Sequence, residues 1–251
     1  MISLKNKVTL ITGGSRGIGA ATALLFARAG SDIVINYVEN GARAAAVVDG
    51  VKRTGRRIAT HQGNVGASSV ARELLDKTLG EFGKVDIVVN NAGIWTHGEI
   101  GATAEEVWDE TLDTNLKGVF NVCNVAVPYL KENGGGRIIN ISSTAGQRGE
   151  AFHSHYAASK GGILAFTKSL STELAPYNVL VNSVAPGWVD TDMNEEVFAD
   201  KTFREQVINT IPLRKIATAE DIAGAVLFLA SELANHITGA TINVNGGSVL
   251  N

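Results

Sequence analysis

Cysteine and proline are scarce in this sequence, which has one cysteine and 4 prolines among 251 residues. A single cysteine, Cys123, excludes an intrachain disulfide, and this is typical of a protein from a reducing compartment. The mostly apolar residues from Val119 to Val122 favour a buried structural thiol over a nucleophile. Few prolines beside 28 glycines indicate tight turns between regular elements rather than a disordered chain.

Long apolar runs and an excess of positive charge are also lacking. No stretch is long enough to span a bilayer, and the N-terminus lacks the basic and apolar regions of a secretory signal. The chain has 22 basic and 25 acidic residues, a net charge of −3, which gives no electrostatic footprint for nucleic acid or an anionic membrane. We therefore expect a cytoplasmic protein with neither nucleic acid nor membrane among its partners.

Apolar, β-branched runs alternate with helical patterns along the whole chain. Strands are expected over 8–11, 33–37, 57–61, 85–89, 137–141, 179–184 and 240–244, and helices over 20–29, 41–54, 68–82, 104–127, 156–174 and 219–229. The pattern predicts an α/β fold, a single domain over 1–251 whose doubly wound sheet has seven mainly parallel strands with helices on both faces. Segment 188–216 is richer in charge and lacks a strand pattern, so we expect a substrate-side lid insertion there.

The first predicted strand leads into a glycine-rich loop and then into a helix. The loop reads Gly13-Gly14-Ser15-Arg16-Gly17-Ile18-Gly19, and strand, glycine loop and helix in that order predict a dinucleotide site. Gly13 permits the tight turn, Gly17 lets the backbone approach a pyrophosphate, and Gly19 lets the helix pack against the strand. The helix N-terminus then offers N–H groups and the positive end of its dipole to the phosphates.

The end of the second predicted strand bears on the choice between NADP(H) and NAD(H). NAD-binding folds place an acid there for the ribose 2′-hydroxyl, whereas this chain has Asn36 and Tyr37. The missing acid, together with Arg16 in the glycine loop, favours a 2′-phosphate and hence NADP(H). NAD(H) stays open, because Glu39 is near enough in the sequence to take the place of that acid.

Amides follow the third and fourth predicted strands. Asn64 is placed to reach an adenine amino group or its own turn backbone, and the sequence does not decide between them. Asn90 to Gly93 offer small residues and amides that line a cofactor ring or stabilise the strand end. Asn115 lies inside a predicted helix although Asn is a mediocre helix former, which favours a bound water or a local distortion of the helix.

A serine, a tyrosine and a lysine follow the fifth predicted strand. Tyr156 and Lys160 are four residues apart and share a helix face. A Tyr is a poor base at neutral pH, and a nearby ammonium is expected to lower its pKa. Ser143 at the strand end is placed to hydrogen-bond a substrate oxygen. An isolated pair of this kind is more simply a solvated helix pair, but here all the candidate residues fall at the strand ends where such folds bind ligands.

Taken together, these motifs resemble the short-chain dehydrogenase/reductase family over essentially the whole chain. The residues that carry the resemblance are Thr12 to Gly19, Asn90 to Gly93, Asn115, Ser143, Tyr156 with Lys160, and Pro186-Gly187. The resemblance implies a Rossmann-type fold, usually a homotetramer. It implies an enzyme that interconverts a ketone and a secondary alcohol with a nicotinamide cofactor.

The same resemblance implies a role for each catalytic residue. Tyr156 is expected to be the acid or base, and Ser143 to polarise the carbonyl. Lys160 is expected to hold the nicotinamide ribose and to lower the pKa of Tyr156. Asn115 is expected to anchor a water that connects Lys160 to solvent. No metal is expected, because the hydride comes from the cofactor and the charge is met by the Ser and Tyr hydroxyls.

The expected cofactor site joins the glycine loop to the ends of the other strands. By resemblance, Asn64 and Val65 flank the adenine, and Val189 and Thr191 contact the nicotinamide carboxamide. The cofactor-binding residues expected in all are Gly13, Ser15, Arg16, Gly17, Ile18, Gly19, Asn36, Tyr37, Asn64, Val65, Asn91, Ala92, Gly93, Tyr156, Lys160, Pro186, Gly187, Val189 and Thr191.

Two later segments, 182–193 and 237–247, look most like those of β-ketoacyl-acyl-carrier-protein reductases. Those reductases commonly carry arginines near the rim of the active site that receive the acidic carrier protein. The matching positions here are Gly134 and Tyr177, with Lys131 and Arg148 as candidate substitutes. The resemblance therefore implies a 3-oxoacyl reductase whose docking surface departs from the pattern.

The substrate side of the site is expected to be walled by Trp95, His153, His155 and Trp188. Such walls favour a compact substrate over a long acyl arm, although the two histidines are equally well read as solvated loop residues. The leading hypothesis is an NADP(H)-dependent enzyme for a small-molecule or acyl-thioester carbonyl. Its alternatives are a sugar, polyol or small-alcohol dehydrogenase, and a catalytically silent dinucleotide-binding sensor or scaffold.

Overall fold

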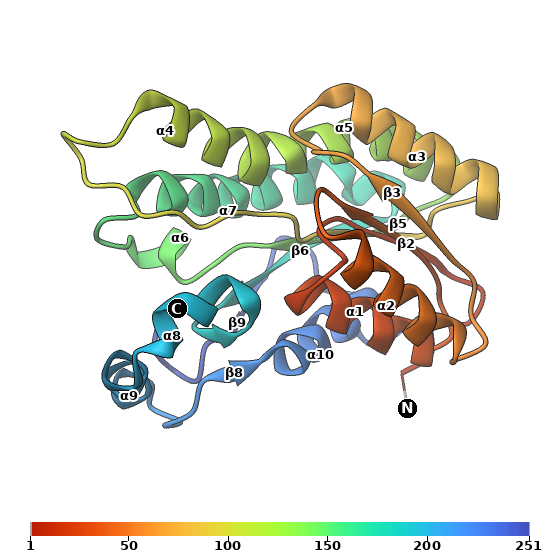
Figure 1. The fold of residues 1–251 in the computed structure, drawn as a ribbon. Helices are drawn as coiled ribbons and strands as arrows, with labels where there is room; N and C mark the ends of the chain where they lie inside the picture. The colour runs from red at the N-terminus through yellow and green to blue at the C-terminus, as the bar shows by residue number, and fades with distance from the viewer. Residues whose placement is uncertain (1, 251) are drawn as a thin grey trace.

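The computed structural model describes residues 2–250 and is organised around one parallel sheet (Figure 1). The sheet has seven strands in the order β3-β2-β1-β4-β5-β6-β9, and every neighbouring pair is parallel. The strands are β1 (Val8–Ile11), β2 (Asp32–Tyr37), β3 (Ile58–Gln62), β4 (Ile87–Asn90), β5 (Gly136–Ile141), β6 (Val179–Pro186) and β9 (Thr241–Val244). The predicted fold class is confirmed.

Helices cover both faces of this sheet. The longer ones are α1 (Gly17–Arg28), α2 (Gly41–Lys52), α3 (Ser68–Phe82), α4 (Glu105–Leu112), α5 (Gly118–Glu132), α7 (Ser154–Leu174), α9 (Lys201–Thr210) and α10 (Ala219–Ala230). Helices α1, α2 and α10 pack on one face, and α3, α5 and α7 pack on the other, as Figure 1 shows. The chain is therefore a three-layer sandwich.

Alternate strand residues supply the two halves of the core. Ile33 and Ile35 of β2 face the α1 side, whereas Val34 between them faces the α3 side. All three are fully buried. This is the period of two that a strand imposes on its side chains, and with both faces covered it gives continuous apolar runs in the sequence.

The buried core also contains the single cysteine. Cys123 lies on α5 with 2% of its surface exposed, and its sulfur accepts a hydrogen bond from the Asn90 amide. Burial raises the pKa of this thiol to about 12. The prediction of a buried structural thiol is confirmed.

Three local features bear on the sequence expectations. The short and then long helix expected over 104–127 is found as α4 and α5, which are joined by a π-helical turn, η1 (Asp113–Lys117), that contains Asn115, and α5 continues past Pro128 to Glu132. A short helix, α6 (Ala145–Arg148), precedes α7. Within 188–216, the predicted absence of a strand is wrong, because β7 (Val189–Asp190) pairs with β8 (Ala217–Thr218) outside the main sheet.

The segment between β7 and β8 packs on a small core of its own. It contains α8 (Glu195–Ala199) and α9, whose Phe198 and Val207 are buried together with Ile211. Trp188 and Phe203 pack against this cluster. The segment thus joins the end of β6 to α10 as a compact unit beside the strand ends.

Sheet order determines where the candidate residues meet. Strands β1, β4, β5 and β6 are neighbours, so the loops that follow them emerge side by side at one edge of the sheet. Over residues 2–250, no helix is long and apolar enough to cross a membrane.

Candidate functional site

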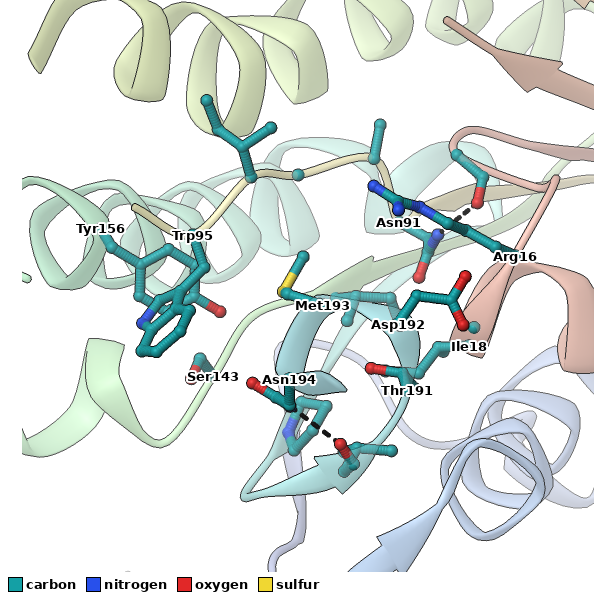
Figure 2. A pocket seen from close by; sticks show the side chains of 18 of the residues that line it. Arg16, Ile18, Asn91, Trp95, Ser143, Tyr156, Thr191, Asp192, Met193 and Asn194 are labelled. Carbon is teal, nitrogen blue, oxygen red and sulfur yellow. Dashed lines mark hydrogen bonds between the residues drawn. The ribbon is translucent and has the colours of Figure 1, made fainter. Parts of the chain in front are cut away.

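A cavity of about 440 Å³ opens at this edge of the sheet (Figure 2). It runs from the glycine loop after β1 to the segment that follows β6. The predicted site residues that line it are Gly13, Ser15, Arg16, Gly17, Ile18, Tyr37, Asn64, Asn91, Ala92, Gly93, Trp95, Ser143, Tyr156, Lys160, Pro186, Gly187, Trp188, Val189 and Thr191.

The glycine loop is held against the end of β4 by hydrogen bonds. The Asn91 side-chain amide donates to the carbonyls of Thr12 and Gly13, both at 3.0 Å. The Thr12 hydroxyl accepts from the backbone N–H groups of Asn91 and Ala92. Asn91 therefore stabilises the junction of the two strand ends and at the same time lines the cavity (Figure 2).

The shape of the loop fits a dinucleotide. Gly13 and Gly17 have φ of 63° and 51°, a region that favours glycine. A Cβ on Gly19 would lie 2.2 Å from the Gly13 carbonyl oxygen, so only glycine lets α1 approach the loop. No side chain caps the first turn of α1, which leaves its N–H groups available for phosphate oxygens.

Gly19, Asn36 and Val65 do not line the cavity. Gly19 packs against the loop instead. The Asn36 amide is buried and donates to the carbonyls of His61 and Gly63. Val65 is 3% exposed and belongs to the core on the α3 side. Gly19 thus lets the helix pack closely, as the sequence predicts, whereas Asn36 and Val65, which were predicted among the cofactor-binding residues, do not reach the cavity.

Asn64 and Glu39 do reach the cavity at its adenine end. The Asn64 side-chain oxygen accepts from the Gly66 N–H at 2.9 Å, so this Asn at least caps its own turn. Arg16 also lines the cavity and is drawn near Asn91 in Figure 2. One arginine and one glutamate of the cavity are thus the candidates for contacting a ribose 2′-substituent.

Ser143 and Tyr156 both line the other end of the cavity. Ser143 follows β5, and its hydroxyl accepts from the Ala145 N–H at 3.1 Å. Burial raises the pKa of Tyr156 to about 12, whereas its interaction with the Ser143 side chain lowers the pKa and the charge of Glu150 raises it. Lys160 is not among the groups that shift this pKa, so the lowering that the sequence predicts is not seen in this structure.

Lys160 lies one helical turn below Tyr156. Its ammonium is 5.7 Å from the centre of the Tyr156 ring and donates to the Ile141 carbonyl at 2.9 Å. The residue is 4% exposed, and burial lowers its pKa to about 8. A Cβ on Gly93 would lie 3.3 Å from the Lys160 Nζ, so a glycine there leaves room for the ammonium at the cavity wall.

Asn115 is fully buried in the π-helical turn and does not line the cavity. Its oxygen accepts from the Ile94 N–H at 2.8 Å, and its amide donates to the Ile94 carbonyl and the Ser159 hydroxyl. A Cβ on Gly93 would lie 3.2 Å from the Asn115 oxygen. The distortion that the sequence suggested thus brings Asn115 beside Lys160 and fixes the chain after β4.

Aromatic side chains form the wall on the substrate side. Trp95 and Trp188 line the cavity with their rings nearly perpendicular, 6.0 Å apart. His153 stacks behind Trp95 at 4.3 Å, and His155 is 1% exposed and hydrogen-bonded to Thr96. The prediction that both histidines line the substrate side is therefore wrong, because they support the wall from behind.

Several residues that line the cavity escaped the sequence analysis: Glu150 follows Ser143, and Asp192 to Asn194 follow Thr191. Arg148 also lines the cavity, and the sequence suggested it only as a substitute for a docking arginine. The Asn194 amide donates to the Val189 carbonyl, and Asp192 pairs with Arg43 of α2. A charged residue in a loop has no periodic signature, so only its closeness to Ser143 and Thr191 in the chain was available as a signal.

Comparisons with known proteins agree with this geometry. A family model described as "Enoyl-(Acyl carrier protein) reductase" matches residues 13–249. The chain is 40% identical over 242 residues to the 3-oxoacyl-[acyl-carrier-protein] reductase of Staphylococcus epidermidis, covering 96% of this chain and 98% of that protein. It is 41% identical over 252 residues to the enzyme of the same name from Synechocystis, covering 100% of both.

A solved structure described as a putative short-chain alcohol dehydrogenase from Sinorhizobium meliloti is similar throughout. Its TM-score is 0.94 at 32% identity, with 98% of this chain and 97% of that chain covered. Such an identity over nearly all of both chains shows common family membership as well as a common fold. The chain therefore belongs to the short-chain dehydrogenase/reductase family and is an oxidoreductase that interconverts a carbonyl and an alcohol with a nicotinamide dinucleotide.

Proposed function

We propose that this protein uses NADPH to reduce the ketone of a 3-oxoacyl thioester. The observation that carries the proposal is that Ser143, Tyr156 and the glycine loop line one cavity, in which burial raises the pKa of Tyr156 to about 12. At neutral pH such a tyrosine keeps its proton, which suits it to be a general acid. The printed names of the 3-oxoacyl-[acyl-carrier-protein] reductases support the substrate class.

The two hydroxyls act on the ketone oxygen. Ser143 and Tyr156 donate hydrogen bonds to it and stabilise the negative charge that develops there. When bound, the cofactor supplies the hydride that converts the carbonyl carbon to an alcohol carbon. Tyr156 then gives its proton to the oxygen, and this transfer is downhill because an alkoxide is a much stronger base than a phenolate.

Lys160 and Asn115 complete the proposed catalytic group. Lys160 is placed to hold the nicotinamide ribose through its ammonium at the Gly93 wall. Asn115 holds the backbone at Ile94, the residue after Gly93, and lies beside that ammonium. In this proposal, Asn115 and Lys160 return a proton to Tyr156 through a bound water.

The rest of the cavity receives the cofactor in an extended form. The first turn of α1 binds the phosphates, while Tyr37 and Asn64 border the adenine end and Pro186 to Val189 border the nicotinamide. Thr191 lies close to Gly17, where its methyl group would be 3.4 Å from a glycine-replacing Cβ. The segment from β7 to β8 is proposed as the lid over this site.

Replacing Arg16 with Ala should weaken NADPH binding about ten- to a hundredfold and leave NADH nearly unchanged. A charge-assisted contact to a 2′-phosphate contributes roughly 1.5–3 kcal/mol, and NADH lacks that phosphate. Fluorescence titration of both cofactors measures the effect. Arg28→Ala is the matched control, because it removes the same charge from the exposed end of the same helix. If Arg16→Ala lowered the affinity for both cofactors equally, or if the wild type bound NADH more tightly than NADPH, Glu39 would be the ribose contact instead.

A sugar, polyol or small-alcohol dehydrogenase is the second candidate. One observation is in its favour: Trp95 and Trp188 form an aromatic wall on the substrate side. Lys131 and Tyr177 do not line the cavity. They lie just before β5 and β6, at the other end of the sheet, where the Lys131 ammonium is 4.4 Å from the centre of the Tyr177 ring and 3.9 Å from Glu173. The two candidates are separated by comparing turnover of a short 3-oxoacyl thioester with turnover of glucose-like alcohols. Faster turnover of the thioester supports the reductase, and faster turnover of the alcohols supports the dehydrogenase.

We also propose a cytoplasmic homotetramer joined through α5 and α7. A shallow groove between these helices is lined by Leu112, Leu116 and Phe166, with Phe120 half exposed. An unpartnered apolar surface of this kind is typical of a subunit contact. Light scattering of the purified protein should give four times the chain mass of 26.3 kDa, and a Phe120→Glu variant should dissociate. A monomeric mass for the wild type would contradict the proposal.

A further inference from the structure

A carboxylate lies at the substrate end of the cavity, on the loop between α6 and α7. Gly149, with φ of 79°, turns the chain so that Glu150 lines the same cavity as Ser143 and Tyr156. Its side chain is only 20% exposed. The charge acts on the reacting centre, because it contributes to the raised pKa of Tyr156.

Among residues 2–250, no arginine or lysine forms an ion pair with this carboxylate. The basic group nearest to it is His153, whose Nδ1 is 3.9 Å from the carboxylate and 3.0 Å from the Ala151 carbonyl oxygen. Arg148 lines the cavity but is exposed, and within the described chain no ion pair joins it to Glu150. Water and salt screen an exposed guanidinium more than a carboxylate that is four-fifths covered.

The substrate-side wall is aromatic. Trp95 and Trp188 line it, and the faces of aromatic rings carry partial negative charge. The Lys160 ammonium also lines the cavity, where it donates to the Ile141 carbonyl, and Arg16 is drawn on the far side of Met193 from Trp95 and Tyr156 (Figure 2). Glu150 thus adds a carboxylate at the substrate end, beside the proposed position of the ketone.

We propose that Glu150 is a specificity-determining residue that makes the site reject ketones with a negative charge beside the reacting carbon. This inference rests on the proposed function and deepens it, since it assigns the carbonyl substrate to an uncharged acyl derivative rather than a free 3-oxo acid. A largely covered carboxylate repels an anionic substrate, which also loses part of its hydration when it enters the site. An uncharged thioester does not pay this free-energy cost, so the carboxylate favours the thioester over the anion.

The test compares one ketone in two charge states. NADPH-dependent reduction of the 3-oxobutanoyl thioester of N-acetylcysteamine and of the 3-oxobutanoate anion is measured in the wild type, Glu150→Gln and Glu110→Gln. Glu110 also lines the cavity but is exposed on α4, so it serves as the matched control. The ratio of the two kcat/KM values is the readout, because any effect of Glu150 on Tyr156 acts on both substrates and cancels.

The ratio of thioester to anion should fall roughly tenfold in Glu150→Gln and stay unchanged in Glu110→Gln. A ketone that carries a trimethylammonium group should respond in the opposite direction. Glu150→Ala, checked by circular dichroism and NADPH affinity, repeats the test if the first variant folds poorly. An unchanged ratio in both Glu150 variants overturns the inference alone, whereas a wild type that reduces neither substrate overturns the proposed function with it.

Discussion

Replacing Tyr156 with Phe should lower kcat for ketone reduction about a thousandfold and leave NADPH affinity within twofold, in the range expected for loss of a positioned general acid. The variant keeps the ring beside Lys160 and removes only the Tyr156 hydroxyl. The alkoxide then loses the group that this account assigns as its proton donor. Steady-state kinetics and a fluorescence titration with NADPH measure the two quantities.

Tyr129→Phe is the matched control for this experiment. Tyr129 lies on α5, donates to the Gly83 carbonyl at 3.4 Å and does not line the cavity. Removal of the Tyr129 hydroxyl should leave kcat unchanged. If Tyr156→Phe kept a tenth or more of the wild-type kcat, another group would have to supply the proton, and the assignment of Tyr156 as the acid would be wrong.

Replacing Lys160 with Met should abolish ketone reduction and at the same time stabilise the fold. Burial lowers the pKa of Lys160 from 10.5 to about 8, so the folded protein holds this charge at a cost of at most about 3 kcal/mol at pH 7. Met fills a similar volume without charge, but the hydrogen bond to the Ile141 carbonyl is lost. We expect the free energy of unfolding to increase by roughly 1–2 kcal/mol, which corresponds to about 2–8 °C in the unfolding midpoint.

The stability that Lys160→Met gains over the wild type should decrease as the pH rises. Below pH 8 both the folded and the unfolded state hold the Lys160 proton, and the whole cost is present. Between pH 8 and 10.5 the unfolded state binds more protons than the folded state, so the stability contributed at this site rises with pH. The advantage of Lys160→Met over the wild type should therefore shrink through this window.

Thermal unfolding of both proteins at several pH values measures this difference, and subtraction removes the titration of all shared groups. Lys168→Met, an exposed position on the same helix, is the control and should shift the midpoint little. A Lys160→Met variant that is less stable than the wild type at pH 7 would contradict the account. It would mean that the ammonium is held by favourable contacts that outweigh its desolvation.

Much of the fold followed from patterns that the sequence displays directly. The α3 bounds were predicted residue for residue, because an apolar face at helical spacing ends at Gly83, which has a φ of 74°. The strands were predicted because both faces of the sheet are covered, which makes each one a continuous apolar run. The glycine loop followed from its spacing, since each glycine answers a steric demand of the turn or of helix packing.

The site was predicted less completely, because its remaining properties depend on tertiary burial. Nothing local reveals that desolvation raises the pKa of Tyr156. The same holds for His155, which the sequence cannot distinguish from a wall residue although it is buried behind one. Asn36 shows a third case, because its buried amide serves the β3 turn rather than a ribose.

Single-turnover transfer of deuterium tests the central claim most directly. The protein is mixed with NADPH carrying deuterium at the reactive position and with a 3-oxobutanoyl thioester, and the product is analysed by mass spectrometry. The account predicts a 3-hydroxybutanoyl thioester with one deuterium at its alcohol carbon, formed by the wild type and not by Tyr156→Phe on the same time scale. Absence of labelled product from this thioester, with labelled product from sugar-derived or small ketones, would contradict the proposed substrate class.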